Sequence, residues 1–247
     1  MRNYMLIIEY DGGLYHGFQI QKGSLTVQER LETAISTLAK EPVKVIGASR
    51  TDAGVHALGQ VVNFESGITV PVSKLPVAIN SLLPPDIRIK AAKPVHNSFH
   101  ARFDAVEKTY VYRIFQAPIA SVFYRHYALW IRDELDWVKI DKASRDLVGT
   151  HDFYSFAASG GSAKTSTRTI HACIIQKEQE LTELRFTGNG FLYNMVRNIV
   201  GTLLEIGWGK RDVTSIPQIL AARDRCYAGP TAQAHGLCLE SVRYTTV

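Results

Sequence analysis

The sequence is poor in cysteine and contains no long hydrophobic run. Its three cysteines are an odd number without paired metal-ligand spacing, which favours reduced thiols over a disulfide framework. No apolar stretch approaches the roughly 20 residues that a membrane-spanning helix needs, and the first residues lack the apolar core of a signal peptide. We therefore expect a cytoplasmic protein that is not embedded in a membrane.

Several chemical signatures are missing as well. The chain has no GxxxxGK[ST] phosphate-binding loop, no HExxH zinc motif and no CxxC pair. Asp52 and His56 are four residues apart, but Gly54 between them argues against a helical pair of metal ligands. The sequence therefore predicts neither a Walker-type phosphate cradle nor a metal site.

What is present is typical of a globular protein. The 247 residues suffice for a sizeable core, and 46% hydrophobic with 21% charged residues argues against disorder. Lysine and arginine number 28 against 23 acidic residues, which gives a formal net charge of +5. This balance permits a polyanionic partner without identifying one.

The apolar pattern predicts a mixture of strands and helices. Thr26 and Glu29 have the spacing of a capping box, and Val27, Leu31 and Ile35 follow on one helical face. Strands are expected at 4–10, 43–46, 61–64, 87–89 and 184–186 and within a β-rich stretch over 99–115, with further helices over 73–82 and from Phe191 to Leu204.

The chain also shows a weak internal similarity. "IIEYDGGLYHGF" and "LRFTGNGFLYNM" both read as a strand, a polar glycine turn and an aromatic residue. We predict two halves, residues 1–104 and 105–247, that share a continuous sheet. The stretch 159–168 is small, polar and basic, which indicates a mobile loop.

The segment "ASRTDAGVHALGQV", residues 48–61, places polar residues between two apolar runs. In an extended segment Arg50 and Asp52 point the same way and could face one cleft. Aspartate beside glycine is also a common turn residue that binds backbone N–H groups. The local pattern leaves both interpretations open.

For Tyr110 and Arg197 the local pattern likewise allows either a structural or a functional role. Tyr110 shares a strand face with Tyr112, and the pattern alone favours an ordinary core aromatic. Arg197 lies at the edge of the apolar face of its helix, where a guanidinium must reach solvent or meet a carboxylate.

Together these motifs resemble a known family, the tRNA pseudouridine synthases that modify the anticodon arm. Besides residues 48–61, the resemblance rests on "EYDGGLYHGFQIQ", "INSLLPPDI", "FHARFDAVEKTYVYRI", "GFLYNMVRNIVG" and "GLCLESVRY", in the family's order over about residues 7 to 244. Two positions depart from the pattern: Ser49 replaces a common glycine, and Gln233 stands where proline is frequent.

The resemblance implies a reaction and a set of roles. Uridine at positions 38, 39 and 40 of the tRNA anticodon stem-loop becomes pseudouridine, without a cofactor. Asp52 supplies an ionised carboxylate, which attacks C1′, attacks C6 or removes the C2′ proton. Arg197 keeps that carboxylate charged, Tyr110 stacks on the uracil, and Arg50 fills the gap or holds phosphate while the base is out of its stack.

The resemblance also implies an architecture. An α+β fold is expected, in which two similar halves with antiparallel sheets merge into one mixed sheet, with helices on one face and an RNA-binding cleft on the other. The family works as a homodimer on tRNA. Lys164 and Arg168, in the basic loop, are expected to contact tRNA.

Two rival functions remain at this point. One is a catalytically inactive RNA-binding relative, and the other is a metal-assisted hydrolase that uses Asp52 and His56. Activity on uridine-containing tRNA in excess chelator separates all three.

Overall fold

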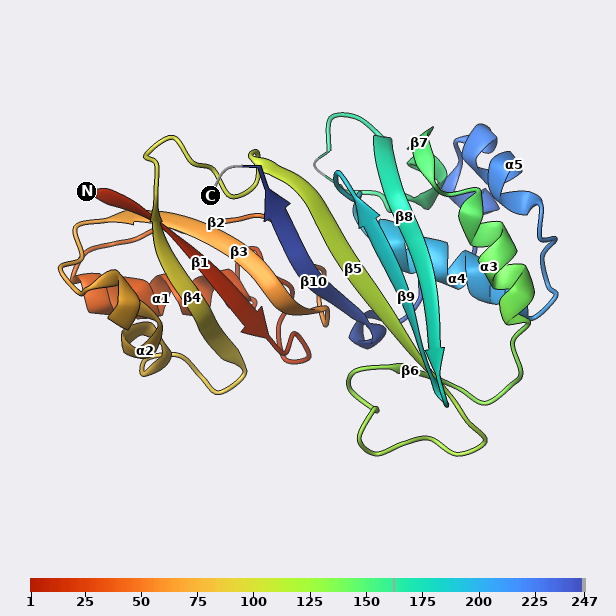
Figure 1. Ribbon diagram of the computed structural model, residues 1–247, viewed down its shortest axis with the longest axis horizontal. Helices are drawn as coiled ribbons and strands as arrows, with labels where there is room; N and C mark the ends of the chain where they lie inside the picture. The colour runs from red at the N-terminus through yellow and green to blue at the C-terminus, as the bar shows by residue number, and fades with distance from the viewer. Residues whose placement is uncertain (162, 246–247) are drawn as a thin grey trace. The chain divides into compact units, whose positions relative to one another are not determined.

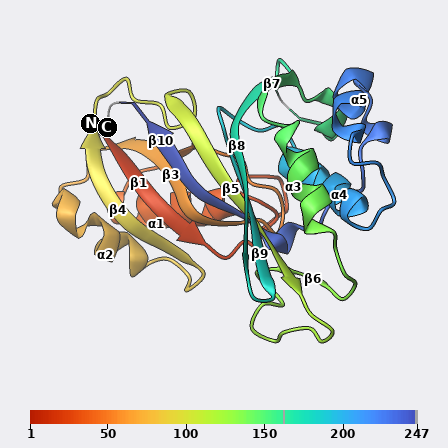
Figure 2. The ribbon, with the colours of Figure 1, turned by 45° about the vertical axis from the view of Figure 1, so that its right-hand side comes forward.

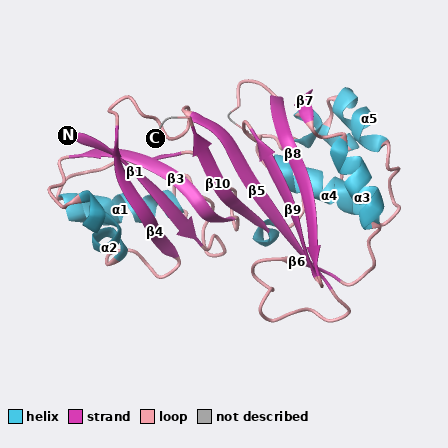
Figure 3. Ribbon diagram, in the orientation of Figure 1, coloured by secondary structure: helices cyan, strands magenta, loops and turns pink. Residues whose placement is uncertain are grey.

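The computed structural model describes residues 1–161 and 163–245, so Ser162 of the expected basic loop lies outside the described residues. The chain divides into two compact units: Met1–Val106 together with Cys238–Val247, and Glu107–Leu237. Ten strands and five α-helices are described, which confirms the α+β class (Figure 3). Within this part of the chain, no helix combines the length and apolar character needed to cross a membrane.

The sheet of the first unit is mixed. Its strands lie in the order β4 (Ile87–Val95), β1 (Arg2–Tyr10), β3 (His56–Ser66) and β10 (Leu237–Tyr244), and β2 (Ile46–Gly47) also pairs with β3. β1 is antiparallel to both of its neighbours, whereas β10 is parallel to β3. The parallel register places Cys238 opposite His56, directly after the polar run.

Helices α1 (Val27–Ala39) and α2 (Leu75–Asn80) lie on one face of this sheet (Figure 1). The amide of Glu29 donates to the Thr26 hydroxyl at 3.4 Å, which caps α1 as the sequence predicts. Val27, Leu31 and Ile35 are buried along one stripe. The expected helix over 73–82 is a 3₁₀ turn (Val72–Lys74) followed by α2.

The strand expected at 43–46 is mostly wrong. Val43 and Val45 are buried, but their amides donate to the Ser36 hydroxyl at 2.9 Å and to Glu32 Oε1 at 3.1 Å. Side chains of α1 therefore satisfy this backbone, and only Ile46–Gly47 joins the sheet. The strand expected at 61–64 is confirmed as part of the longer β3.

The sheet of the second unit is largely antiparallel. Its strands lie in the order β5 (Ala105–Gln116), β9 (Leu181–Gly188), β8 (Thr167–Glu178) and β7 (Gly149–Asp152), with β6 (Leu129–Ile131) parallel to β5. The helices of this unit are α3 (Trp137–Arg145), α4 (Met195–Gly207) and α5 (Ser215–Ala222). α3 and α4 lie on the same face of its strands (Figure 2).

Two expected boundaries in the sequence need correction. The helix expected from Phe191 begins at Met195, because Asn194 has a φ of 57°, a left-handed conformation that an α-helix cannot contain. The β-rich stretch expected from Phe99 becomes a strand only at Ala105. Before it, the amide of Asp104 donates to the carbonyl of His100, which closes a turn.

Candidate active site

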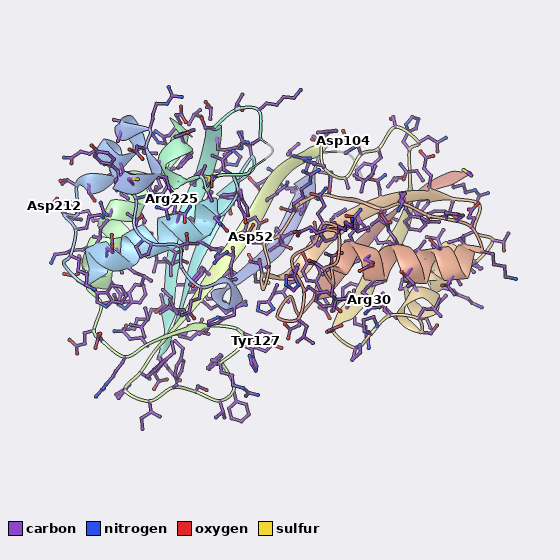
Figure 4. The ribbon with its side chains drawn as sticks, turned by 180° about the vertical axis from the view of Figure 1, so that it is seen from behind. Arg30, Asp52, Asp104, Tyr127, Asp212 and Arg225 are labelled. Carbon is purple, nitrogen blue, oxygen red and sulfur yellow. The ribbon has the colours of Figure 1, made fainter. Side chains whose placement is uncertain are left out.

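The loop around Asp52 is held by backbone hydrogen bonds to the N-terminal loop of the same unit. The amide of Phe18 donates to the carbonyl of Thr51 at 3.1 Å, and the amide of Gly54 donates to the carbonyl of Tyr15 at 3.2 Å. A turn bond from Val55 N to Asp52 O closes the loop at 3.1 Å. The half-buried Asp52 side chain, labelled in Figure 4, thus stands on a fixed backbone.

Glycine allows the two loops to approach this closely. A Cβ on Gly12 would lie 2.0 Å from the carbonyl oxygen of Val55. One on Gly17, whose φ is +84°, would lie 2.6 Å from that of Thr51. Gly12 and Gly17 of "YDGGLYHGF" therefore allow this loop to pack against the Asp52 loop.

Buried polar side chains anchor the loop from its other side. Gln60 is fully buried on β3; its Oε1 accepts from Ser49 N at 3.1 Å and its Nε2 donates to Ser49 O at 2.7 Å. The hydroxyls of Tyr10 and Thr51 are 2.7 Å apart. Sequence reasoning missed these supports, although Gln60 beside two buried valines in "GQVVNF" was an available signal.

His56 supports the N-terminal loop that packs against the Asp52 loop. Its side chain is buried, and its Nδ1 accepts from Gly12 N at 3.0 Å and lies 3.1 Å from Asp11 Oδ1. Across residues 1–161 and 163–245, no group of three or more histidine, cysteine or acidic side chains is placed to hold a metal ion.

Arg50 lies exposed on the same loop. Desolvation by its surroundings and, to a smaller extent, the nearby Arg102 guanidinium lower the pKa of Arg50, which still remains a cation at neutral pH. The Arg102 guanidinium carbon lies 5.8 Å from the ring centroid of the exposed Phe103, and that ring stacks on His100 at 4.2 Å. An exposed aromatic ring with one cation over it and a second cation near the first is a combination that suits binding of a nucleic-acid strand.

Tyr110 lies on β5 opposite Phe186 of β9. Its side chain meets the ring of Phe191 edge to face, with centroids 5.3 Å apart. Only 6% of Tyr110 is exposed, so little of its surface is accessible to a ligand.

Arg197 is half-buried in the first turn of α4, at the edge of the apolar face as the sequence predicts. Its Nε donates to the carbonyl of Ala232 at 2.7 Å and its Nη1 to Asn194 Oδ1 at 2.9 Å. Tyr112 is close enough for the charge of Arg197 to act on its hydroxyl, although burial is the larger effect and raises the pKa of Tyr112.

The two basic residues of the 159–168 stretch differ in their surroundings. Lys164 is exposed. Arg168 instead directs Nη1 to the carbonyls of Thr165 at 3.0 Å and Thr167 at 2.6 Å, and desolvation lowers its pKa. Arg168 therefore stabilises the backbone of this segment, while Lys164 is available to a ligand.

The second unit also contains a cavity of about 290 Å³ beside β6. Phe115 and Tyr124 stack at its wall with ring centroids 5.2 Å apart. The lining is completed by Ala120, Ser121, Arg125, Ala128, Leu129, Trp130, Gln233 and His235. Nothing in the sequence pattern predicted this cavity.

The structure thus groups the predicted site residues in two sets. Arg50 and Asp52 share one loop of the first unit, whereas Tyr110 and Arg197 belong to the second. Each set is fixed by contacts within its own unit, and the pairing of Asp52 with Arg197 stays a prediction.

Comparison with known proteins gives a consistent result. Residues 6–104 and 143–245 match a family model described as tRNA pseudouridine synthase. The chain is 48% identical over 244 residues to the tRNA pseudouridine synthase A of Acetivibrio thermocellus, covering 99% of this chain and 100% of that protein. It is 46% identical to the protein of the same name from Bacillus licheniformis, covering 96% and 97% of the two chains.

Likeness to solved structures is more distant. A chain in the structure titled "Structure of H/ACA RNP bound to a substrate RNA containing 2'-deoxyuridine" is 11% identical, with a TM-score of 0.40. The match covers 82% of this chain and 44% of that one.

Proposed function

Because the chain belongs to the tRNA pseudouridine synthase family, we propose that it isomerises uridine to pseudouridine at positions 38, 39 and 40 of the tRNA anticodon stem-loop. In this reaction the C1′–N1 bond breaks and a C1′–C5 bond forms. C5 loses a proton and N1 gains one, so atoms and electrons balance without a cofactor. The chemistry calls for one ionised carboxylate and for groups that hold the base while it turns.

Asp52 supplies that carboxylate in this proposal. The observation that carries the assignment is the immobilised loop, because Thr51, Gly54 and Val55 are all hydrogen-bonded around a half-buried Asp52. A fixed backbone keeps a nucleophile or base at one distance from the reacting sugar. The three routes, attack at C1′, attack at C6 and removal of the C2′ proton, all use this same group.

The second unit provides the partners. Arg197 stabilises the charged form of Asp52, since a nearby cation lowers the pKa of a carboxylate. Tyr110 stacks on the uracil and keeps the released base from escaping. Its limited exposure suits contact with one base rather than with a run of stacked nucleotides.

The remaining residues bind tRNA. Arg50, with Arg102 beside it, contacts phosphate or fills the space of the displaced base. Lys164 contacts the phosphate backbone of the tRNA, and Arg168 stabilises the protein segment that carries Lys164.

We further propose that the protein acts in the cytoplasm as a homodimer. Light scattering should then give about twice the 27.5 kDa of one chain, and a single-chain mass at micromolar concentration would contradict this.

The decisive experiment maps pseudouridine in total tRNA treated with the purified protein, in buffer with and without excess chelator. We expect new pseudouridine only at positions 38 to 40, and equal yields in both buffers. A yield abolished by chelator would favour metal-assisted chemistry. Bound but unmodified tRNA would favour an inactive RNA-binding protein.

A further inference from the structure

A segment of irregular backbone, residues 228–233, lies directly against α4 in the second unit; we name it the strap. A Cβ on Gly201 of α4 would lie 1.7 Å from the carbonyl oxygen of Pro230, and a Cβ on Gly229 would lie 2.8 Å from Thr202 Cα. The amide of Gly229 donates to the Thr202 hydroxyl at 2.8 Å. The strap and the helix are therefore packed backbone to backbone.

A side-chain network fixes the strap along its length. Asn198 of α4 is fully buried, and its Oδ1 accepts from the Thr231 hydroxyl at 2.6 Å and from Arg225 Nη2 at 3.0 Å. Its Nδ2 donates to the carbonyl of Phe156 at 2.8 Å, which sets the orientation of the amide. Arg225, labelled in Figure 4, also donates to the carbonyl of Ala228 at 3.2 Å.

Two consecutive carbonyls of the strap accept hydrogen bonds, one from Arg197 of the candidate site and one from Tyr112 of β5. The carbonyl of Ala232 accepts from Arg197 Nε at 2.7 Å, while that of Gln233 accepts from the Tyr112 hydroxyl at 2.8 Å. Tyr112 is two residues from Tyr110 on β5 and points to the same side of the strand. The strap thus sets the position of Arg197 relative to β5.

We propose that Thr231 and Asn198 are positioning residues that act on catalysis through the strap. Their hydrogen bond fixes the Ala232 carbonyl, and this carbonyl holds the Arg197 guanidinium in the orientation that serves the carboxylate of Asp52. An arginine side chain has many rotamers, so without a fixed acceptor it spends only part of its time in the productive orientation. This inference rests on the proposed function.

Thr231 offers the cleanest test because it is exposed and valine has nearly the same shape. In Thr231→Val the hydroxyl donor to Asn198 is lost, whereas Thr231→Ser retains it. Thr37→Val is the matched control, since Thr37 is also exposed and donates its hydroxyl to a protein oxygen, the carbonyl of Thr33 at 2.8 Å. Thr37 lies on α1 in the first unit.

Turnover can be followed with tRNA that carries tritium at C5 of uridine, because C5 loses its hydrogen when it bonds to C1′. Single-turnover rates with enzyme in excess are independent of the fraction of inactive protein. For Thr231→Val we expect a rate constant at saturation about fivefold below the parent, the effect of one lost hydrogen bond. The enzyme concentration giving half-saturation should stay unchanged. Thr231→Ser and Thr37→Val should match the parent.

Arg225→Met provides a second variant, which removes the donors to Asn198, Ala228 and the Thr231 hydroxyl while keeping a long side chain. It should slow the same step without weakening tRNA binding. Parent-like single-turnover rates in both Thr231→Val and Arg225→Met would overturn the inference, and so would a Thr231→Ser variant as slow as Thr231→Val. A parent protein that releases no tritium would overturn the proposed function itself, and this inference with it.

Discussion

The side-chain amide of Gln60 forms two hydrogen bonds with the backbone of Ser49: Oε1 accepts from the Ser49 N–H at 3.1 Å, and Nε2 donates to the Ser49 carbonyl at 2.7 Å. Gln60 belongs to the rigid strand β3, and Ser49 stands three residues before Asp52. These two hydrogen bonds therefore tie the loop that carries the proposed catalytic carboxylate to the sheet.

We predict that Gln60→Leu destabilises the protein by about 2 kcal/mol, because the amide and carbonyl of Ser49 lose their partners in a largely buried site. Urea unfolding would measure the loss. Gln218→Leu, at an exposed position of α5, should stay within about 0.5 kcal/mol of the parent. Equal stability of the two variants would show that the Ser49 contacts contribute nothing.

Asp52→Asn should form no detectable pseudouridine while still binding tRNA. Asparagine has nearly the same shape and can keep the loop, but it is neither a nucleophile nor a base. If Arg197 faces a neutral partner, the melting temperature should fall modestly, since a buried pair costs about 3–5 kcal/mol to break and a solvated one less. Asp133→Asn, at an exposed position, serves as control. Appreciable turnover by Asp52→Asn would refute the catalytic assignment.

Tyr110→Phe should keep the fold and most tRNA affinity but lose most turnover. The ring can still pack against Phe191 and meet uracil, whereas a hydroxyl able to relay the proton at C5 is gone. Tritium release and filter binding separate the two effects, and Tyr227→Phe at an exposed site is the control. Turnover at the parent rate would show that the Tyr110 hydroxyl has no chemical role and that the ring serves only for stacking.

Affinity for tRNA should fall steeply with salt, because each phosphate contact releases counterions. The net charge of +5 and the exposed Lys164 motivate this expectation. Lys164→Gln should reduce the slope of log K against log salt by about one. Lys74→Gln, in the turn before α2, should leave it unchanged. A flat plot for the parent protein would argue against electrostatic binding.

The sequence sufficed where structure depends on nearby residues. The apolar stripe and the Thr26 cap predicted α1 because both signals lie within a few residues of each other. The sequence predicted a strand over 43–46, but the amides of Val43 and Val45 bind side chains of α1 instead. These partners lie several residues away, so the local apolar pattern could not reveal them. The late start of α4, caused by the left-handed Asn194, was equally invisible in an apolar pattern that fits a helix from Phe191.

The site shows the same division. The Asp52 loop was predicted because its polar residues are adjacent in the sequence. Gln60 and the Ala232 carbonyl were missed because each acts on a residue distant along the chain. Structure also accounts for one departure from the family pattern: Gln233 has a φ of −61°, which is the value that proline imposes, so the strap keeps its course with glutamine there.

The parallel pairing of β10 with His56 and Ala57 has a consequence for synthesis on the ribosome. β1 pairs with one edge of β3. On the other edge β2 pairs with Val62 and Asn63, and the beginning of β3, next to the Asp52 loop, pairs with β10. The second unit, Glu107–Leu237, is translated after β3 and before the residues of β10 that pair with β3. A nascent chain that ends before β10 therefore carries all the proposed site residues and has β1 beside the start of β3, but it lacks the strand on the other edge. The first unit is completed only after the second unit has been made.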